Sequence, residues 1–334
     1  MQRTAQQVLL KQRPDGLTDD NTWELAHAEV PELSDGQFVV DVQYISVDPA
    51  MRGWLNDVRS YIPPVQIGEV MRAIGVGTVI QSRHPDFAAG TTVRGSFGVT
   101  DVAISDGTDV TTVDVSIAPA TTWLGALGMP GMTAYFGLLE IGKIQAGETL
   151  LVSGAAGAVG SIVGQIGKLK GATVIGIAGG PEKCDWLIND LGFDHAIDYK
   201  NERVLRRLRE IAPDGIDVYF DNVGGPTLDA ALANLARGAR IVICGGISSY
   251  NEDSLPPGPS RYMSLLVFRA SMTGFVVFDY ADRFDEAVSD LATWIANGEI
   301  IAHEHVADGG VAAFGETLNM LFAGRNTGKL VLKT

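Results

Sequence analysis

Short runs of apolar and β-branched residues, separated by polar turns, characterise the chain up to about residue 120. Apolar residues alternate or cluster over strand lengths in four of these runs, at 37–47, 75–82, 91–99 and 109–115. Clusters of Pro, Gly and Asp such as PPVQIGE and HPDFAAG lie between the runs and are typical of surface connections. The pattern predicts a mostly β domain of barrel type.

The pattern changes near Gly128, where apolar runs begin to alternate with helical periodicity. Six runs are short and apolar, as expected of parallel strands covered by helices on both faces. These runs lie at 149–153, 173–178, 195–199, 216–220, 240–244 and 271–277. The helical segments lie at 161–171, 180–192, 201–212, 227–238 and 282–298. The alternation predicts an α/β fold with a doubly wound parallel sheet.

The last part of the chain carries a further helical pattern and the strand-like KLVLKT. These elements indicate that the tail returns to the first domain. We therefore expect one domain over 1–122 and 299–334, and a second domain over 123–298.

The composition narrows the class of protein. With 334 residues, 46% of them hydrophobic and 19% charged, the chain is long enough for two globular domains. A formal net charge of −15 argues against binding to nucleic acid or to an anionic membrane. The two cysteines, Cys184 and Cys244, cannot form a disulfide framework, and the most apolar stretches are shorter than the ~20 residues that span a bilayer. We expect a soluble protein of the reducing cytoplasm.

A glycine-rich turn follows the first predicted parallel strand, in the stretch LLVSGAAGAVGSIVGQIGKLKG. Dinucleotide turns need close backbone approach to the pyrophosphate and a helix whose first N–H groups face the phosphates. Gly157 stands where a side chain would meet the pyrophosphate, and Gly160 stands where the helix approaches the strand. Ala155 replaces the first glycine of the fingerprint, and Gly154 before it can share the bending role. The turn predicts a bound dinucleotide.

The end of the second parallel strand, IGIAGGPEK, indicates which dinucleotide. NAD sites usually place a carboxylate there for the ribose 2′-hydroxyl, whereas this strand ends in Ala178, Gly179 and Gly180. Lys183 follows in the first turn of the next helix, which favours NADP. A register slip of two or three residues would instead bring Glu182 to the strand end, so both readings stay open at this point.

Several catalytic motifs are missing. The chain has no HExxH, no metal-spaced cysteine pair, no GxSxG elbow and no tyrosine with a lysine four positions later. The five histidines are scattered. Chemistry must therefore rely on the cofactor together with hydroxyl or backbone donors.

Six motifs together resemble one branch of the medium-chain dehydrogenase/reductase superfamily. They are VDPAMRG (47–53), AAGAVGS, FDNVGG (220–225), CGGISSYN (244–251), GFVVFDY (274–280) and FAGRNTGKLVLK (322–333). The branch is the zinc-independent leukotriene B4 dehydrogenase/prostaglandin reductase group, which includes NADP-dependent alkenal double-bond reductases. The resemblance implies a doubly wound Rossmann domain, a GroES-like β-rich domain and no metal. Where zinc alcohol dehydrogenases carry ligands, this chain reads ISVDP and Ile67-Gly68-Glu69.

The resemblance also implies which residues bind NADP. The implied cofactor residues are Gly157, Val159, Gly160, Gly179, Lys183, Tyr199, Asn222, Cys244, Gly245, Ile247, Ser248, Tyr250, Phe275, Val276, Val277 and Asn326. Lys183 and Tyr199 would contact the 2′-phosphate region, and the main chain of 275–277 would approach the nicotinamide. The resemblance further implies a homodimer joined through the Rossmann domains around RASMTGFVV.

The chain departs from the family pattern at two positions. Ala50 replaces a frequent tyrosine of the VDPAMRG motif, and Val267 replaces a tyrosine often proposed as proton donor. Tyr262 and Tyr250 are the nearby substitutes, and solvent or the cofactor ribose could also supply the proton. Losing both aromatic rings suggests a wider substrate pocket.

Our leading prediction is an NADPH-dependent reductase of the C=C bond of α,β-unsaturated aldehydes or ketones, with hydride transfer to the β-carbon. Such an addition needs only hydrogen-bond donors at the enolate oxygen, so it does not require a metal. The alternatives are an NADPH quinone oxidoreductase and an NADP-binding sensor or structural protein with little catalysis.

Overall fold

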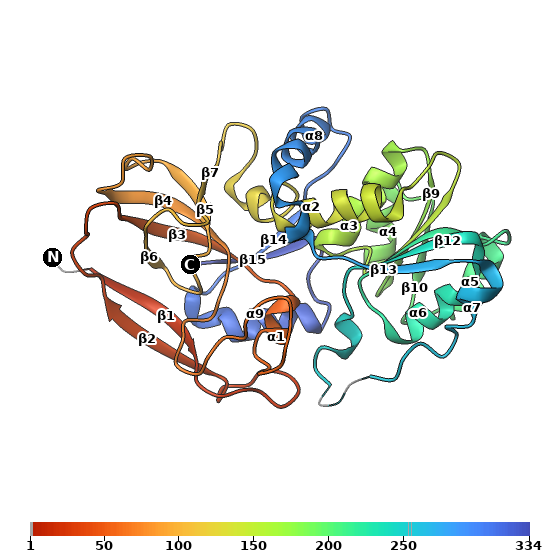
Figure 1. Ribbon diagram of the computed structural model, residues 1–334, viewed down its shortest axis with the longest axis horizontal. Coiled ribbons are helices and arrows are strands. Elements are labelled where there is room, and N and C mark those ends of the chain that lie inside the picture. The colour runs from red at the N-terminus through yellow and green to blue at the C-terminus, as the bar shows by residue number, and fades with distance from the viewer. Residues whose placement is uncertain (1–2, 253, 255) are drawn as a thin grey trace. The chain divides into compact units, whose positions relative to one another are not determined.

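The computed structural model describes residues 3–252, 254 and 256–334. The chain divides into two compact units, a β-rich unit (Met1–Leu124 and Glu304–Thr334) and a doubly wound unit (Gly125–His303). Figure 1 shows the elements of each unit along the colour gradient of the chain. The tail from Glu304 onward therefore belongs to the same unit as the N-terminal residues.

The β-rich unit contains two sheets. One is an antiparallel pair of β1 and β2, and the other is seven-stranded in the order β14-β15-β3-β4-β5-β7, with β6 paired to β3. The tail supplies two of these strands, since β15 pairs antiparallel with β3 and β14 pairs parallel with β15. The strands are β1 (Thr4–Leu10), β2 (Trp23–Glu29), β3 (Phe38–Ser46), β4 (Gly75–Ser82), β5 (Thr92–Gly95), β6 (Val102–Ser105), β7 (Thr111–Thr112), β14 (Glu304–Ala307) and β15 (Lys329–Lys333).

Short helices complete the β-rich unit, namely α1 (Ala50–Gly53), η1 (Ala120–Leu124), η5 (Val311–Ala313) and α9 (Phe314–Phe322). The predicted runs correspond to β3, β4, β5 and β7, although β5 and β7 are shorter than their runs. The hydropathy pattern did not predict β1 and β2. In β2 the side chains are exposed or half-buried, so the strand lacks the buried apolar face that produces a clear signal.

The doubly wound unit is built on a six-stranded sheet in which all strands are parallel, in the order β10-β9-β8-β11-β12-β13. Its strands are β8 (Thr149–Ser153), β9 (Thr173–Ala178), β10 (His195–Asp198), β11 (Ile216–Asp221), β12 (Leu235–Ile243) and β13 (Ser271–Gly274). The sequence order of these strands across the sheet is 3-2-1-4-5-6, which is the Rossmann arrangement. The predicted fold class is confirmed.

Helices cover both faces of this sheet. In Figure 1, α3 and α4 lie on one side, and α5, α6 and α7 lie on the other. The second face is sealed by a buried cluster that joins strand residues such as Ile175, Tyr219 and Ile241 to Leu208 of α5 and Leu232 of α6. The helices are α2 (Met129–Phe136), the π-helix η2 (Gly137–Gly142), α3 (Ala158–Leu169), α4 (Pro181–Asn189), α5 (Val204–Ile211), α6 (Gly225–Leu232), η3 (Ile247–Ser249), α7 (Ser264–Phe268), η4 (Val277–Arg283) and α8 (Phe284–Ala296).

Two predicted elements need correction. The segment 227–238 is not one helix, because α6 ends at Leu232 and β12 begins at Leu235. The chain turns at Asn234, whose side-chain amide donates to the carbonyl of Ala212, and Leu235 is then buried as a strand residue. The strand predicted over 271–277 ends at Gly274, and the 3-10 helix η4 begins at Val277.

Candidate functional site

The strand order of the doubly wound unit creates a topological switch point at β8. This strand has β9 on one side and β11 on the other, so the connections leaving the two halves of the sheet diverge there. Ligands of open α/β sheets bind outside the carboxyl ends of the strands at such a point. The glycine-rich turn follows β8 directly, and FDNVGG begins within β11.

The turn after β8 bends at Gly154, whose φ of +58° lies in the left-handed region that favours glycine. Ala155 is fully buried, and its N–H donates to the carbonyl of Ile177, which ties the turn to β9. Replacement of the first fingerprint glycine by alanine is therefore compatible with the turn, because Gly154 provides the bend.

The two fingerprint glycines differ in how tightly the turn surrounds them, and only Gly160 is excluded from carrying a side chain by the protein itself. Gly157 is the N-cap of α3, and a Cβ on it would meet only the carbonyl oxygen of Gly154, at 3.2 Å. At Gly160 a Cβ would lie 2.4 Å from that same oxygen and 2.8 Å from the Cα of Ala155. Helix α3 thus starts in close contact with the turn, and its first N–H groups point out of the carboxyl edge of the sheet. This arrangement fits a pyrophosphate.

The ends of β9 and β10 form a second part of the site. Strand β9 ends at Ala178 and helix α4 begins at Pro181, so Glu182 lies exposed in the first helical turn and not at the strand end. A Cβ on Gly179 would meet Tyr199 at 2.8 Å and the Cε of Lys200 at 2.9 Å, so both side chains lie against its backbone. Burial and the nearby Lys200 lower the pKa of Lys183. Two ammonium groups and a tyrosine therefore surround a strand end without a carboxylate, which fits the 2′-phosphate of NADP.

A buried carboxylate links the ends of β8 and β11. One oxygen of Asp221, which is 1% exposed, accepts hydrogen bonds from the Ser153 hydroxyl at 2.9 Å and from the Tyr219 hydroxyl at 2.7 Å. The same oxygen accepts the N–H groups of Val223 and Gly224, while its second oxygen is buried without a partner among the described residues. The Asp221 carboxylate therefore holds the ends of β8 and β11 and the start of the loop after β11 together at the switch point.

Asn222 is held by the same group of contacts. Its N–H donates to the Ser153 hydroxyl oxygen at 2.9 Å, and its side-chain amide donates to the Ser153 carbonyl at 2.7 Å. The loop after β12 continues this arrangement, because the N–H groups of Cys244 and Gly245 donate to the Asp221 carbonyl and that of Ile247 donates to the Asn222 carbonyl. Ser248 donates both its N–H and its hydroxyl to the Val223 carbonyl. These predicted cofactor residues thus lie together.

Tyr250 and Tyr262, the two predicted catalytic residues, have different surroundings. The Tyr250 hydroxyl accepts the N–H of Gly246 at 3.1 Å, which places it against the loop after β12. Tyr262 lies just before α7 and is 60% exposed. Val267, on α7, is 58% exposed. Both catalytic assignments stay predictions.

The segment 275–277 follows β13 at the same edge of the sheet. Phe275 packs edge-on against Phe220, and a Cβ on Gly137 would collide with both rings. Val277 is buried, so the main chain of this segment is held in place by its side chains.

In the β-rich unit, the VDPAMRG motif is attached to the C-terminal tail by a buried ion pair. The Lys329 ammonium, in a residue that is 2% exposed, donates to an Asp48 oxygen at 2.7 Å and to the Val47 carbonyl at 2.8 Å. Burial lowers the pKa of Lys329, and the partner Asp48 opposes that change. Ala50 starts α1, which is formed by the second half of this motif. Asn326 is buried in the same unit and donates to the Gly328 carbonyl, so its cofactor contact stays a prediction.

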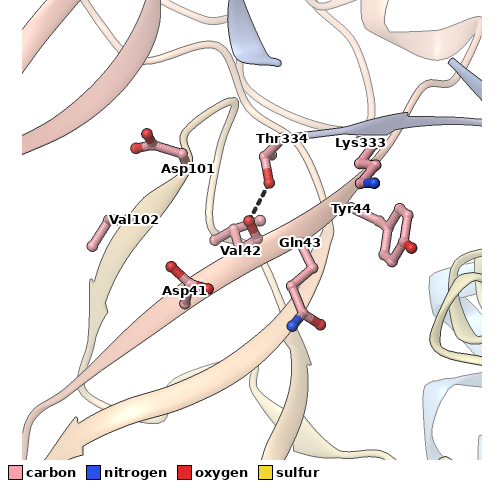
Figure 2. Close-up of a pocket in the computed structure, with 8 residues that line it drawn as sticks. All are labelled: Asp41, Val42, Gln43, Tyr44, Asp101, Val102, Lys333 and Thr334. Carbon is pink, nitrogen blue, oxygen red and sulfur yellow. Dashed lines mark hydrogen bonds between the residues drawn. The ribbon is translucent and has the colours of Figure 1, made fainter. Parts of the chain in front are cut away.

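A depression of about 460 Å³ in the β-rich unit contains none of the predicted site residues. Figure 2 shows it at the end of β15, where the hydroxyl of Thr334 donates to the carbonyl of Val42. It forms because β6 pairs with β3 only up to Asp41, whereas β15 begins pairing at Tyr44. The depression is thus a consequence of strand register. Its lining residues are Asp41, Val42, Gln43, Tyr44, Asp101, Val102, Lys333 and Thr334.

Over residues 3–252, 254 and 256–334, no helix is both long and apolar enough to cross a bilayer. In the same residues, no three His, Cys, Asp or Glu side chains gather as a metal site.

Comparison with known proteins matches most of the chain to two family models. Residues 6–113 match the N-terminal domain of oxidoreductases, and residues 158–294 match the model described as zinc-binding dehydrogenase. The chain is 41% identical to the NADPH-dependent curcumin reductase of Escherichia coli, over 97% of this chain and 95% of that protein. It is 40% identical to prostaglandin reductase 1 of Bos taurus, over 98% of this chain and 99% of that protein.

The chain belongs to the prostaglandin reductase and curcumin reductase branch of the medium-chain dehydrogenase/reductase superfamily. A solved member of this branch, CurA from Vibrio vulnificus in complex with NADPH, superposes with a TM-score of 0.93 at 43% identity, covering 98% of this chain and 99% of that one. The quinone oxidoreductase of Escherichia coli has a TM-score of 0.78 at 20% identity, which shows a shared fold alone. The predicted family, oxidoreductase class and NADP cofactor are confirmed.

Sequence reasoning missed four polar residues of the site. Ser153 and Asp221 end neighbouring strands, and Asp198 and Lys200 lie at the end of β10. A usable signal was present, because a carboxylate ending a buried apolar run must find donors. The motif FDNVGG drew attention to Asn222 rather than to the carboxylate before it.

Proposed function

We propose that the chain is an NADPH-dependent reductase of the C=C bond of α,β-unsaturated aldehydes and ketones. The main support for NADPH as the cofactor is that β9 ends without a carboxylate of its own. Tyr199 and Lys200 lie against Gly179 after this strand, and Lys183 follows in the first turn of α4. The names of the relatives, curcumin reductase and prostaglandin reductase, support an enone as substrate class.

We assign the cofactor to the carboxyl edge of the Rossmann sheet. The N–H groups that begin α3 would bind the pyrophosphate, and Asn222 and the loop 244–248 would flank the ring-bearing half. Bound NADPH supplies the hydride that adds to the β-carbon of the substrate. The chain's own part is to orient both molecules and to place hydrogen-bond donors at the carbonyl oxygen, where negative charge develops.

The proton donor is assigned to one of the two tyrosines. Tyr250 is the group attached to the cofactor loop through Gly246, whereas Tyr262 is the more exposed hydroxyl. A phenol hydroxyl is a hydrogen-bond donor and can deliver a proton to an enolate oxygen. Tyr250→Phe and Tyr262→Phe separate the two, because loss of the proton donor lowers kcat, whereas loss of the Tyr250 contact with the cofactor loop alone raises the KM for NADPH.

The deciding experiment follows NADPH oxidation with an alkenal, an enone and a quinone in parallel. We expect turnover of the alkenal and enone, with the saturated carbonyl as product. Turnover of the quinone alone would assign the chain to the quinone oxidoreductases. Tight NADPH binding without turnover of any electrophile would assign it a sensor or structural role.

We further propose a cytoplasmic homodimer joined through β13. This strand is the edge of the six-stranded sheet, so its outer backbone groups are available to pair with a second copy. Leu266 and Val267 of the preceding helix are 70% and 58% exposed, which adds apolar surface beside that edge. Analytical ultracentrifugation of wild type and of Thr273→Pro tests the dimer, because a proline on an edge strand disfavours its pairing with a further strand. Cell fractionation tests the compartment.

A further inference from the structure

The ends of β9 and β10 are joined by a single carboxylate, that of Asp198, which is 8% exposed. One of its oxygens accepts the N–H of Gly180 at 2.8 Å and the N–H of Lys200 at 3.0 Å. Its other oxygen accepts the side-chain amide of Asn201 at 2.6 Å. Three donors therefore satisfy this carboxylate, and two of them are backbone N–H groups of the loops that follow β9 and β10.

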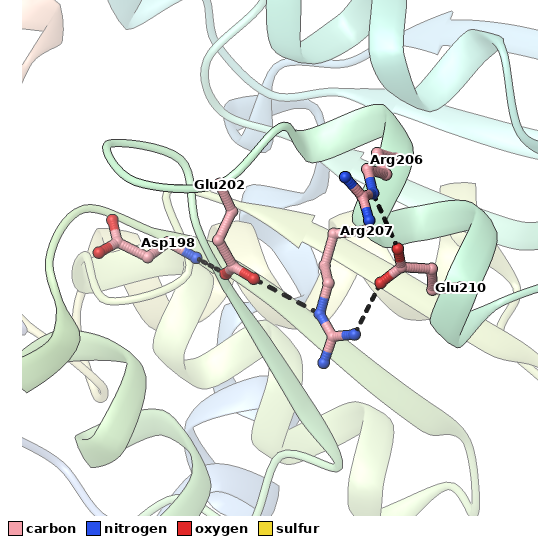
Figure 3. A network of polar contacts seen from close by, with 5 residues as sticks. All are labelled: Asp198, Glu202, Arg206, Arg207 and Glu210. Carbon is pink, nitrogen blue, oxygen red and sulfur yellow. Dashed lines mark hydrogen bonds and ion pairs between the residues drawn. The ribbon is translucent and has the colours of Figure 1, made fainter.

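The backbone of Asp198 is itself held in place by a hydrogen bond to Glu202. Figure 3 shows its N–H donating to Glu202, which pairs with Arg207, which in turn pairs with Glu210. The Asp198 N–H to Glu202 distance is 2.9 Å. Burial alone would raise the pKa of Asp198, but the N–H groups of Gly180 and Lys200 and the amide of Asn201 hold its pKa below the usual range. The Asp198 side chain is thus an anion stabilised by hydrogen bonds from the loops that follow β9 and β10.

The consequence of these bonds is the placement of Lys200. Its backbone is fixed by Asp198, and its side chain crosses the backbone of Gly179 with Cε at 2.9 Å from the position of a Cβ there. Lys183 approaches from the first turn of α4 and is close enough for its pKa to be lowered, first by burial and then by the charge of Lys200. Two like charges are costly together unless an anion is shared between them.

We propose that Lys200 is a second cationic contact for the cofactor's 2′-phosphate, and that Asp198 is the positioning residue that holds it beside Lys183. The proposal rests on the proposed use of NADPH. It makes the preference for NADPH over NADH depend on both loops, the one after β9 and the one after β10. A backbone-anchored lysine meets the phosphate with less loss of side-chain freedom than a mobile surface lysine.

The experiment is a calorimetric titration with 2′,5′-ADP and with 5′-AMP, which differ by the 2′-phosphate alone. The variants are Lys200→Met, Lys183→Met and Asp198→Asn, and the control of equal charge change is Lys11→Met in the β-rich unit. We expect Lys200→Met to weaken 2′,5′-ADP binding about tenfold to hundredfold, as for loss of one hydrogen bond to a charged group, and to change 5′-AMP binding less than twofold. Asp198→Asn should act in the same direction.

A structural role for Asp198 would weaken both ligands equally, so the ratio of the two affinities is the informative quantity. If Asp198→Asn does not fold, as judged by its thermal transition, Asn201→Ala removes one of the three donors at an exposed position and should lower the ratio by a smaller factor. Equal affinity of wild type for 2′,5′-ADP and 5′-AMP would overturn the assignment of NADPH itself. Wild-type discrimination that persists undiminished in Lys200→Met would overturn only the role of Lys200 and Asp198.

Discussion

Replacement of Gly160 by alanine tests the closest backbone contact of the dinucleotide turn. The new Cβ would lie 2.4 Å from the Gly154 carbonyl oxygen, and real Cβ contacts essentially never fall below 3.0 Å, so the turn or the helix must move by about 0.6 Å. The turn is held on its other side by the hydrogen bond from the Ala155 N–H to the Ile177 carbonyl of β9. The movement must therefore displace the N-terminal end of α3 from the turn.

The magnitude follows from two opposing terms. Overpacking of this kind costs about 1–3 kcal/mol, and alanine is favoured over glycine in a helix by about 1 kcal/mol. We expect the free energy of unfolding to fall by roughly 0–2 kcal/mol. Cofactor affinity should fall more. Displaced N–H groups would lose one hydrogen bond to a charged phosphate, which corresponds to about a tenfold to hundredfold rise in the Kd of NADPH.

The assay combines urea denaturation with a fluorescence titration of NADPH. The control is Gly53→Ala, at a helical position of α1 where a Cβ would meet nothing within 4 Å. We expect this control to leave unfolding and NADPH affinity close to wild type. An unchanged Kd of NADPH in Gly160→Ala would refute the reasoning, because the turn would then tolerate the helix displacement without loss of its phosphate contacts.

Three further predictions concern buried groups. Burial, with nearby carboxylates adding to it, raises the pKa of Cys184 to about 11 and that of Cys244 to about 12, so a thiol reagent at pH 8 should react with the native protein roughly 100-fold more slowly than with free cysteine. Fast reaction of the native thiols would contradict their burial. Because both pKa values lie above the unfolded value of about 8.5, the protonated thiols contribute to folding stability below pH 8.5, and this contribution is lost as the pH rises toward 11. Asp221→Ala leaves four donors without their acceptor and should lower the free energy of unfolding, measured by urea denaturation, by about 3–5 kcal/mol. Asp221→Asn should lose less, because it keeps an accepting oxygen. Equal losses in the two variants would contradict the role of that oxygen. Lys329→Met leaves the carboxylate of Asp48 half-buried and unpaired, so it should cost about 3–5 kcal/mol, part of which the double variant with Asp48→Asn recovers; additive losses in the double variant would show that the two residues do not interact.

Local sequence was sufficient for the parts of the fold that depend on short-range periodicity and on glycine. The strands 149–153 and 173–178 were predicted with the bounds that the structure has, because both are continuous apolar runs between turn residues. The prediction of one helix over 227–238 was wrong, because the hydropathy pattern of this segment does not separate the end of α6 from the start of β12. Leucine and alanine there favour a helix by intrinsic propensity, and packing in the cluster on the second face of the sheet overrides that preference from Leu235 onward.

The sequence by itself determined that the chain alternates strand and helix, that a glycine turn follows β8, and that β9 ends without a carboxylate. Each of these features depends on residues close together in the sequence, because turn geometry and the spacing of apolar residues are set over a few positions. The tertiary structure decided the pairing of Asp198 with Gly180 and of Asp221 with Ser153, which are separated by 18 and 68 residues along the chain. Parallel strands bring their carboxyl ends to one edge whatever the length of the helices between them, so the polar partners of the site are set by sheet order and not by sequence spacing.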